Sequence, residues 1–183
     1  MVYRFLILSD EVANFKREIQ ISAEATFLDL HHSISDATQY DRNEICSFFI
    51  CDDDWSKRTE ITLVDMGTTA DADIYLMETT TLEELLTDEQ QRLLYIFDYM
   101  TERSLFMELS EIITGKTLEK PLCSLSIGHP PAQTLSFDEI EKRVEHFDLG
   151  EDFYGDSDYN EDELDAGDYD SESIDNIFDD ERF

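Results

Sequence analysis

Two apolar runs joined by a short polar connection, at residues 93–113 (LLYIFDYMTERSLFMELSEII), constrain the fold of this chain more than any other feature. Apolar and aromatic side chains alternate in residues 94–99 and again in residues 105–109, with the two-residue period of a β-strand. The connection contains no glycine, so we expect a turn of about four or five residues and not a tight two-residue turn. The stretch therefore predicts a β-hairpin within an antiparallel sheet.

The carboxylate of Asp98 interrupts the aromatic run of this hairpin. At a hairpin end, an aspartate accepts hydrogen bonds from backbone N–H groups of the turn. A catalytic or ligand-binding role would require a partner for the carboxylate, and the neighbouring residues supply none. We therefore interpret Asp98 as the corner of the hairpin. The alternative is a ligand site at the hairpin that also uses Tyr95 and Tyr99, which the alternation places together on one strand face.

Other elements are predicted along the first 147 residues. Strands are expected at residues 2–8, 15–21, 45–51 and 59–64, and helices at residues 26–38, 81–86 and 136–147. Residues 115–136 contain two glycines and all three prolines of the chain, and we expect them to be irregular. This set of elements predicts an α+β fold, with a mainly antiparallel mixed sheet and packed helices.

All three predicted helices carry start signals, and for the third these are Ser136 as N-cap and Glu139 at the box position. Thr26 precedes the first helix and is its expected N-cap, with Asp29 in the first turn. Thr81 precedes the second helix, and Glu84 stands three residues later, which predicts a capping box.

His31 is the remaining candidate for a ligand-binding residue. It is followed by His32, but neighbouring helix positions diverge by about 100°, so the two cannot form a joint metal pair. The four histidines of the chain show no metal-site spacing. We interpret His31 as a buried, hydrogen-bonded structural residue, with ligand binding as the alternative. No metal, no cofactor and no catalytic residue is predicted.

Four segments resemble one known family. Residues 25–50 (ATFLDLHHSISDATQYDRNEICSFFI) resemble the helix–strand core of the plasmid pRiA4b ORF-3-like family. The matching positions are Thr26, Asp29, Leu30, His31, Ile34, Ala37, Tyr40, Asp41 and Phe48. Residues 15–22 resemble its second strand, residues 93–112 its aromatic signature, and residues 121–133 (PLCSLSIGHPPAQ) its proline-rich segment. The resemblance implies an α+β fold and no established reaction. It also implies a role as an accessory protein of a mobile element, because some members of the family are passengers of insertion sequences.

This chain departs from the family pattern at most of its polar positions. The family signature continues with Gly-Asp and later Trp and His, whereas this chain has Met100-Thr-Glu and Leu105-Phe-Met. Ala132 and Gln133 replace an acidic pair. Only Asp98 and His31 remain of the polar groups that the resemblance would place in a site.

The composition changes at about residue 148. Residues 148–183 contain 16 acidic residues and one basic residue, with scattered aromatic side chains. Such a segment cannot bury enough apolar area to offset the entropy of ordering it. We therefore expect a folded domain at residues 1–147 and a disordered acidic tail at residues 148–183.

The formal net charge of −32 limits the classes of partner. It repels nucleic acids and anionic membranes and attracts basic protein surfaces. The three cysteines (Cys46, Cys51 and Cys123) form no CxxC pair, which is typical of the reducing cytoplasm. No apolar run approaches the roughly 20 residues of a membrane span. We expect a cytoplasmic protein whose oligomeric state the sequence leaves open.

Three functional hypotheses follow. The first is a non-enzymatic interaction module whose acidic tail engages a basic partner. The second is a small-ligand-binding or enzymatic domain with a pocket near the hairpin at residues 95–109. The third, which rests on the resemblance alone, is an accessory protein of a mobile genetic element.

Overall fold

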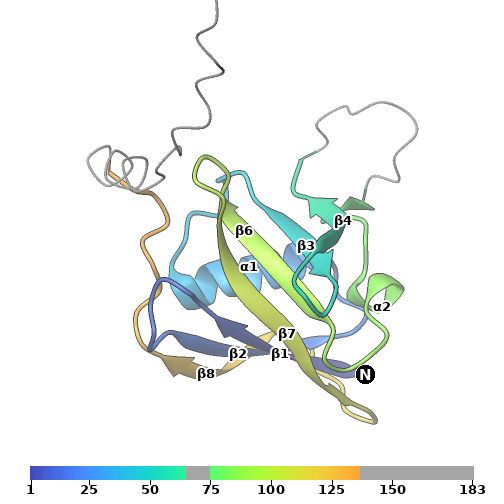
Figure 1. The fold of residues 1–183 in the computed structure, drawn as a ribbon. Coiled ribbons are helices and arrows are strands. Elements are labelled where there is room, and N and C mark those ends of the chain that lie inside the picture. The colour runs from blue at the N-terminus through green and yellow to red at the C-terminus, as the bar shows by residue number, and fades with distance from the viewer. Residues whose placement is uncertain (65–74, 137–183) are drawn as a thin grey trace, which may run out of the picture. The chain divides into compact units, whose positions relative to one another are not determined.

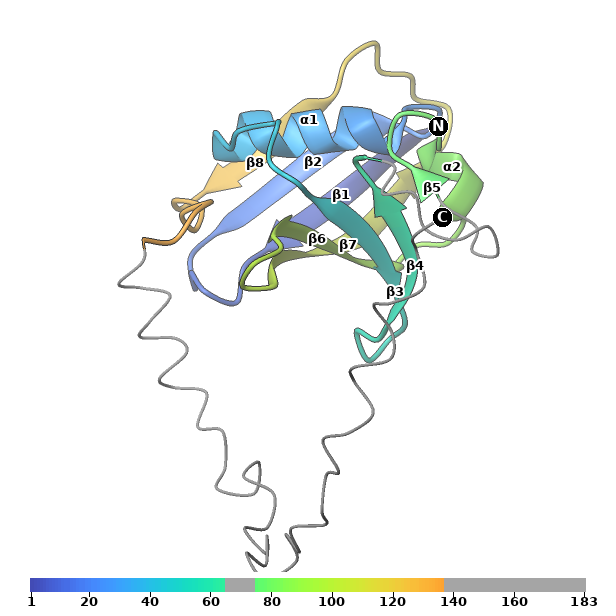
Figure 2. The same cartoon turned by 90° about the horizontal axis from the view of Figure 1, so that it is seen from above.

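The computed structural model describes residues 1–64 and 75–136. Within them, one eight-stranded sheet curves around a single long helix (Figures 1 and 2). The elements are β1 (Val2–Leu8), β2 (Lys16–Ser22), α1 (Phe27–Thr38), β3 (Ser47–Cys51), β4 (Lys57–Thr62), β5 (Tyr75–Leu76), α2 (Leu82–Leu85), β6 (Arg92–Asp98), β7 (Arg103–Ile113) and β8 (Leu122–Ile127).

The strand order is β5-β4-β3-β6-β7-β1-β2-β8. Every pairing is antiparallel except β4 with β5, which is parallel. This confirms the predicted α+β class with a mainly antiparallel mixed sheet.

The predicted hairpin lies at the centre of the sheet. Strands β6 and β7 pair along their length, and Asp98 is opposite Arg103, so residues 99–102 form a four-residue connection. Glu102 in this turn has a φ of 51°, which lets the chain reverse without a glycine. Both the hairpin and its turn length are confirmed, although β7 extends four residues beyond the predicted end at residue 109.

The core lies between the sheet and α1. The helix buries one stripe formed by Phe27, Leu30 and Ile34, whose spacing of three and four residues places them on one face. Alternate residues of the strands face this stripe. They include Phe5, Ile7, Ile19, Ile21, Phe48, Tyr95, Leu105, Met107 and Leu109, all of which are buried.

The two helix starts behave differently. Thr26 forms the predicted cap: its Oγ1 accepts from the Asp29 N–H, and the Asp29 carboxylate accepts from the Thr26 N–H. Thr81 occupies the N-cap position of α2, but its side chain makes no cap hydrogen bond, so the predicted capping box is wrong. Instead, the N–H groups of residues 82 and 83 donate to the backbone carbonyls of residues 25 and 23, and the Glu84 N–H, which a capping box would use, donates to the Thr81 carbonyl.

The prediction of an irregular segment at residues 115–136 is also wrong, because it contains β8. This strand pairs with β2 at the edge of the sheet, and its side chains are mostly exposed. An edge strand without a buried face lacks the alternating pattern that reveals other strands. The two-residue strand β5 was not expected either, and β4 begins at Lys57, two residues before the predicted start.

Several predictions fall outside the described residues. They are most of the helix at residues 136–147, the domain boundary after residue 147, and the acidic tail. Among the residues that the structure describes, no helix has the length and apolarity needed to cross a membrane.

Candidate functional site

His31 and Tyr95 meet inside the core, where helix α1 packs on β6. The Nδ1 atom of His31 lies 2.8 Å from the Tyr95 hydroxyl and 3.4 Å from the Sγ atom of Cys46. On the other side of the ring, Nε2 lies 3.1 Å from the backbone carbonyl oxygen of Arg42. All three side chains are buried. The structure thus brings together two of the four residues singled out from the sequence, and it adds Cys46.

The contacts of His31 determine its tautomer. A carbonyl oxygen can only accept, so Nε2 carries the proton and donates to Arg42. The free lone pair of Nδ1 then accepts from the Tyr95 hydroxyl. Burial lowers the pKa of His31 below its usual value, raises that of Cys46 to about 11, and raises that of Tyr95. The group is therefore neutral near pH 7, with its hydrogen-bonding capacity used inside the fold.

Asp98 lies at the corner of the β6–β7 hairpin and not in this buried group. Its Oδ1 atom accepts from the Met100 backbone N–H at 3.0 Å, and its Oδ2 atom accepts from the Thr101 hydroxyl at 2.7 Å. These bonds confirm the interpretation of Asp98 as the residue that fixes the turn.

Tyr99 lies in the turn beyond the end of β6, so it does not share a face with Tyr95 as the alternation had indicated. The register of β6 with β7 shifts between Ile96 and Asp98, which breaks the two-residue period at this point. The Tyr99 hydroxyl donates to the Glu60 carboxylate on β4 and accepts from the Ser47 hydroxyl on β3. Partial burial raises the pKa of Tyr99 to about 12.

A buried arginine, Arg103, lies at the hairpin end. It is not among the site residues predicted from the sequence. Arg103 forms a two-bond ion pair with Glu11, with Nε–Oε1 and Nη2–Oε2 distances of 2.7 and 2.8 Å. Its guanidinium carbon lies 4.9 Å from the centre of the Phe97 ring, and Nη1 lies 3.7 Å from the Asp98 carboxylate. This cluster ties the β1–β2 connection to the hairpin.

Arg17 has a similar structural role on β2. It donates to three backbone carbonyls of distant segments, those of Ala37, Ile127 and Gly128. The Tyr40 hydroxyl donates to the Pro131 carbonyl. The backbone N–H and C=O of Asp41 both form hydrogen bonds with the Gln133 side chain. The polar groups at this end of the molecule thus join segments that are far apart in sequence.

Neither of two surface pockets contains a residue of the predicted ligand site. One, of about 540 Å³, is lined by Met1, Tyr3, Thr81, Glu83, Glu84, Leu86, Thr87 and Ile112. The other, of about 590 Å³, is lined by Cys51–Asp54 and Asp88–Arg92. Asp98, Tyr95, Tyr99 and His31 line neither of them. Within the described ranges, no group of histidine, cysteine and carboxylate side chains has the arrangement of a metal site.

Comparison with known proteins identifies a family. The profile of the plasmid pRiA4b ORF-3-like protein family matches residues 2–176, so the chain belongs to this family. No curated protein matches. The crystal structure of a protein of unknown function from Methanosarcina mazei Go1 resembles the fold, with a TM-score of 0.51, 20% sequence identity and 68% of each chain covered. At this identity the likeness concerns the fold alone.

Proposed function

We propose that this member of the pRiA4b ORF-3-like family is a non-enzymatic interaction protein that engages a basic partner through its acidic C-terminal segment. The observation that carries the proposal is the charge: the chain has a net charge of −32, and residues 148–183 alone contain 16 acidic residues and one basic residue. A field of this strength accelerates encounter with basic proteins, and this attraction weakens as salt is added.

The folded domain supports the proposal through the use of its polar groups. The hydrogen bonds of His31 and Tyr95 are made within the core, and those of Asp98 are made within its own turn. General acid–base or nucleophilic chemistry would require such groups to face a space where a substrate fits. The alternative of a ligand-binding or enzymatic pocket at the hairpin therefore has less support. A cytoplasmic location and a role in mobile elements remain predictions.

The test is affinity capture of partners from lysate. The bait is the full chain, and the control is a full-length variant in which the 16 acids of residues 148–183 are replaced by asparagine and glutamine. We expect a basic protein, identified by mass spectrometry, that is captured by the natural chain and lost when salt is raised from low to moderate concentration. Equal capture by both baits would contradict the proposal.

A further inference from the structure

The side of the sheet that faces away from α1 carries a row of five apolar side chains across six strands, interrupted by Lys16 on β2. Directly opposite residues of neighbouring strands point to the same face. The pairings place Leu8 opposite Phe106, Phe106 opposite Leu94, and Leu94 opposite Phe49. On the other side of Leu8, Lys16 follows on β2 and Ile127 on β8. We call Ile127, Leu8, Phe106, Leu94 and Phe49 the distal row.

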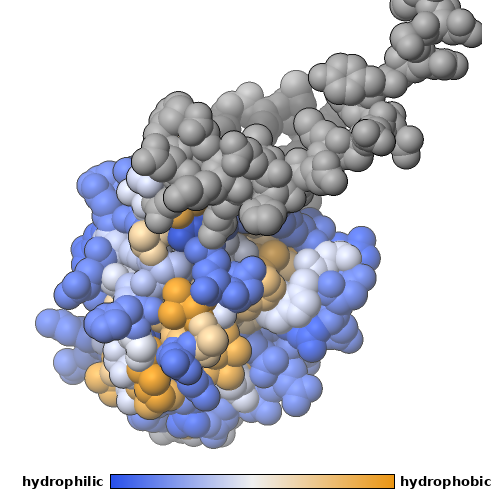
Figure 3. Space-filling model, turned by 60° about the vertical axis from the view of Figure 1, so that its left-hand side comes forward, coloured by the Kyte–Doolittle hydropathy of each residue, from blue (hydrophilic) through white to orange (hydrophobic). Residues whose placement is uncertain are grey.

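This face lies opposite the core. The neighbouring residues Arg17 and Met107 point the other way and are buried, and Arg17 donates to the last turn of α1. The outer members of the distal row are open to solvent: Leu8 is 42% exposed and Ile127 is 48% exposed. The described part of the chain places no helix over this face (Figure 2), and apolar side chains gather at the surface in the space-filling view (Figure 3).

Trp55 extends the row with a fixed aromatic group. It lies in the β3–β4 turn, with a φ of 68° that turns the chain back over the sheet. Its ring meets the Phe106 ring edge-on, with centroids 4.9 Å apart, and the Arg92 guanidinium lies 5.2 Å from the Trp55 ring centre. Tryptophan and arginine are among the residue types that contribute most of the binding energy at protein interfaces.

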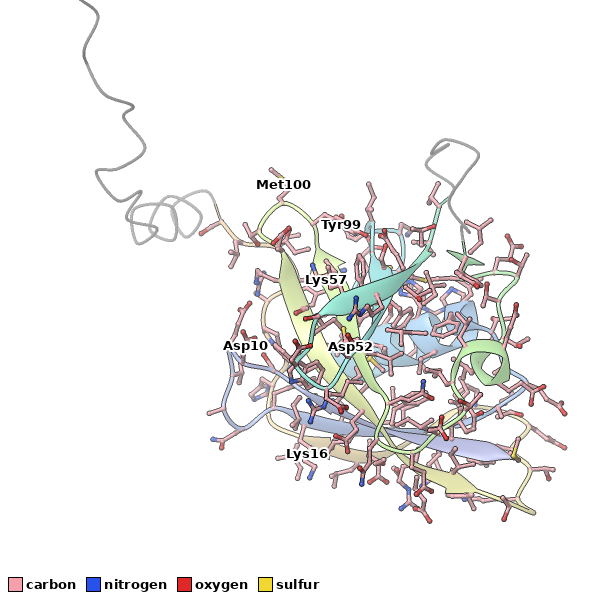
Figure 4. All side chains as sticks on the ribbon, turned by 45° about the vertical axis from the view of Figure 1, so that its right-hand side comes forward. Asp10, Lys16, Asp52, Lys57, Tyr99 and Met100 are labelled. Carbon is pink, nitrogen blue, oxygen red and sulfur yellow. The ribbon has the colours of Figure 1, made fainter. Side chains whose placement is uncertain are left out.

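The surroundings of the row are acidic. The pocket of about 590 Å³ adjoins it through Arg92 and is lined by five carboxylates: Asp52, Asp53, Asp54, Asp88 and Glu89. Asp52 and Lys57 on the β3–β4 hairpin, and Asp10 and Lys16 at the β1–β2 end, mark two sides of this region (Figure 4). Two of its basic side chains lie over aromatic rings, Lys57 over Phe49 and Arg92 over Trp55. Residues 1–136 as a whole contain 25 acidic and 10 basic residues.

We propose that the distal row is a docking surface for a basic amphipathic segment of a partner protein. The apolar side chains of that segment pack on Leu8, Phe106 and Trp55, and a lysine or arginine enters the acidic pocket. Basic amphipathic segments bind exposed apolar surface that is bordered by acidic residues. A second copy of this chain fits less well, because two molecules with a net charge of −32 repel each other. The inference rests on the proposed function and names the surface of the folded domain that takes part in it.

The test uses Trp55, the only tryptophan, as a fluorescent reporter in the full chain. The probe is a synthetic helical peptide with leucines on one face and lysines on the other. Its controls are a peptide of the same composition without an apolar face and a peptide with glutamates in place of the lysines. We expect a blue shift of the Trp55 emission and saturable binding with the amphipathic basic peptide only. No shift, or equal binding of the scrambled peptide, would overturn the inference.

Two double substitutions to aspartate test whether the peptide binds at the distal row. In the full chain, Leu8→Asp combined with Ile127→Asp should weaken peptide binding by about tenfold or more. The control, Ile45→Asp combined with Val64→Asp, changes two side chains that are each 56% exposed but lie outside β1–β8, and it should leave binding unchanged. Equal weakening by the two pairs would overturn the inference, as would self-association that the first pair abolishes.

The variant in which the 16 acids of residues 148–183 are replaced by asparagine and glutamine, here called the tail-neutralised chain, distinguishes this inference from the proposed function. If binding is lost with Leu8→Asp and Ile127→Asp and kept in the tail-neutralised chain, the docking surface stands and the role of the acidic segment fails. If binding is lost only in the tail-neutralised chain, the docking surface is overturned while the proposed function stands.

Discussion

The two faces of this sheet are built from the same strands and differ in nearly every other respect. The face that packs on α1 buries apolar side chains completely, and its polar groups, such as those of Tyr95 and Arg17, have hydrogen-bond partners inside the fold. The opposite face leaves Leu8 and Ile127 exposed beside charged residues. A binding surface is therefore better sought on the face that leaves Leu8 and Ile127 exposed.

The largest expected effect is at Arg103, which is buried at the hairpin end. Arg103→Ala should lower the free energy of unfolding by about 3 kcal/mol, because it removes a buried guanidinium that pairs with Glu11 and packs on the Phe97 ring. The control is Arg42→Ala, which removes an exposed ion pair with Asp36 and should cost less than about 1 kcal/mol. Urea denaturation measures both, and equal losses would remove the distinction between buried and exposed ion pairs.

The second effect compares two tyrosines. Tyr95→Phe should cost about 1–3 kcal/mol, since the Nδ1 atom of His31 loses its closest donor in a buried site. Tyr99→Phe removes a hydroxyl that is partly exposed and should change stability by no more than about 0.5 kcal/mol. Thermal unfolding of the two variants provides the comparison, and a larger loss for Tyr99→Phe would reverse it.

The third effect depends on pH. Burial holds the pKa of His31 below the unfolded value of 6.5, so the unfolded chain binds a proton at a higher pH than the native chain. Stability from this residue is fully present above pH 6.5 and is lost as the pH falls from there toward the lowered pKa. The slope is at most about 1.4 kcal/mol per pH unit.

The control for this effect is His31→Gln, whose stability should vary less between pH 7 and pH 5 than that of the natural chain. The acidic residues are the same in both proteins, so their contribution cancels when the two stability profiles are subtracted. Identical pH profiles would show that His31 does not titrate differently in the two states.

A smaller effect is expected at the turn. Asp98→Ala should cost about 1 kcal/mol, through the loss of its bonds to Met100 and Thr101. Asp98→Asn keeps an acceptor oxygen and should recover part of this loss. A stability measurement on both variants checks the role of the carboxylate, and no loss in either would show that the turn forms without it.

The smallest effect is expected on the open face. Leu8→Asp should change the free energy of unfolding by no more than about 0.5 kcal/mol, because the side chain already faces solvent. The control is Ile7→Asp, one residue earlier and buried in the core, which should prevent folding or cost several kcal/mol. A severe loss from Leu8→Asp would mean that this face is covered in the folded protein.

The sequence reveals the parts of this fold whose periodicity is strong. The alternation around Asp98 indicated the hairpin, and the spacing of Phe27, Leu30 and Ile34 indicated α1. The same reasoning would have found Arg103, because it shares its strand face with Leu105 and Met107, but a charged residue was not considered for the core. Its partner Glu11 is 92 residues away, and no local pattern connects the two.

Other features could not be read from local patterns. The edge strand β8 has no buried face, and the first N–H groups of α2 donate to carbonyls of a segment more than 50 residues earlier. The distal row comes from the register of six strands, and register is set by the packing of the whole sheet. Long-range pairing therefore cannot be inferred from the periodicity of single segments.

The most direct test of the difference between the two faces is hydroxyl-radical labelling of the full chain, read by mass spectrometry, with and without the basic amphipathic peptide. Leu8, Trp55 and Phe106 should be labelled in the free protein and protected by the peptide, while Phe5, Phe27 and Phe48 stay protected throughout. Protection of Leu8, Trp55 and Phe106 in the free chain, or labelling that the peptide does not change, would contradict the account.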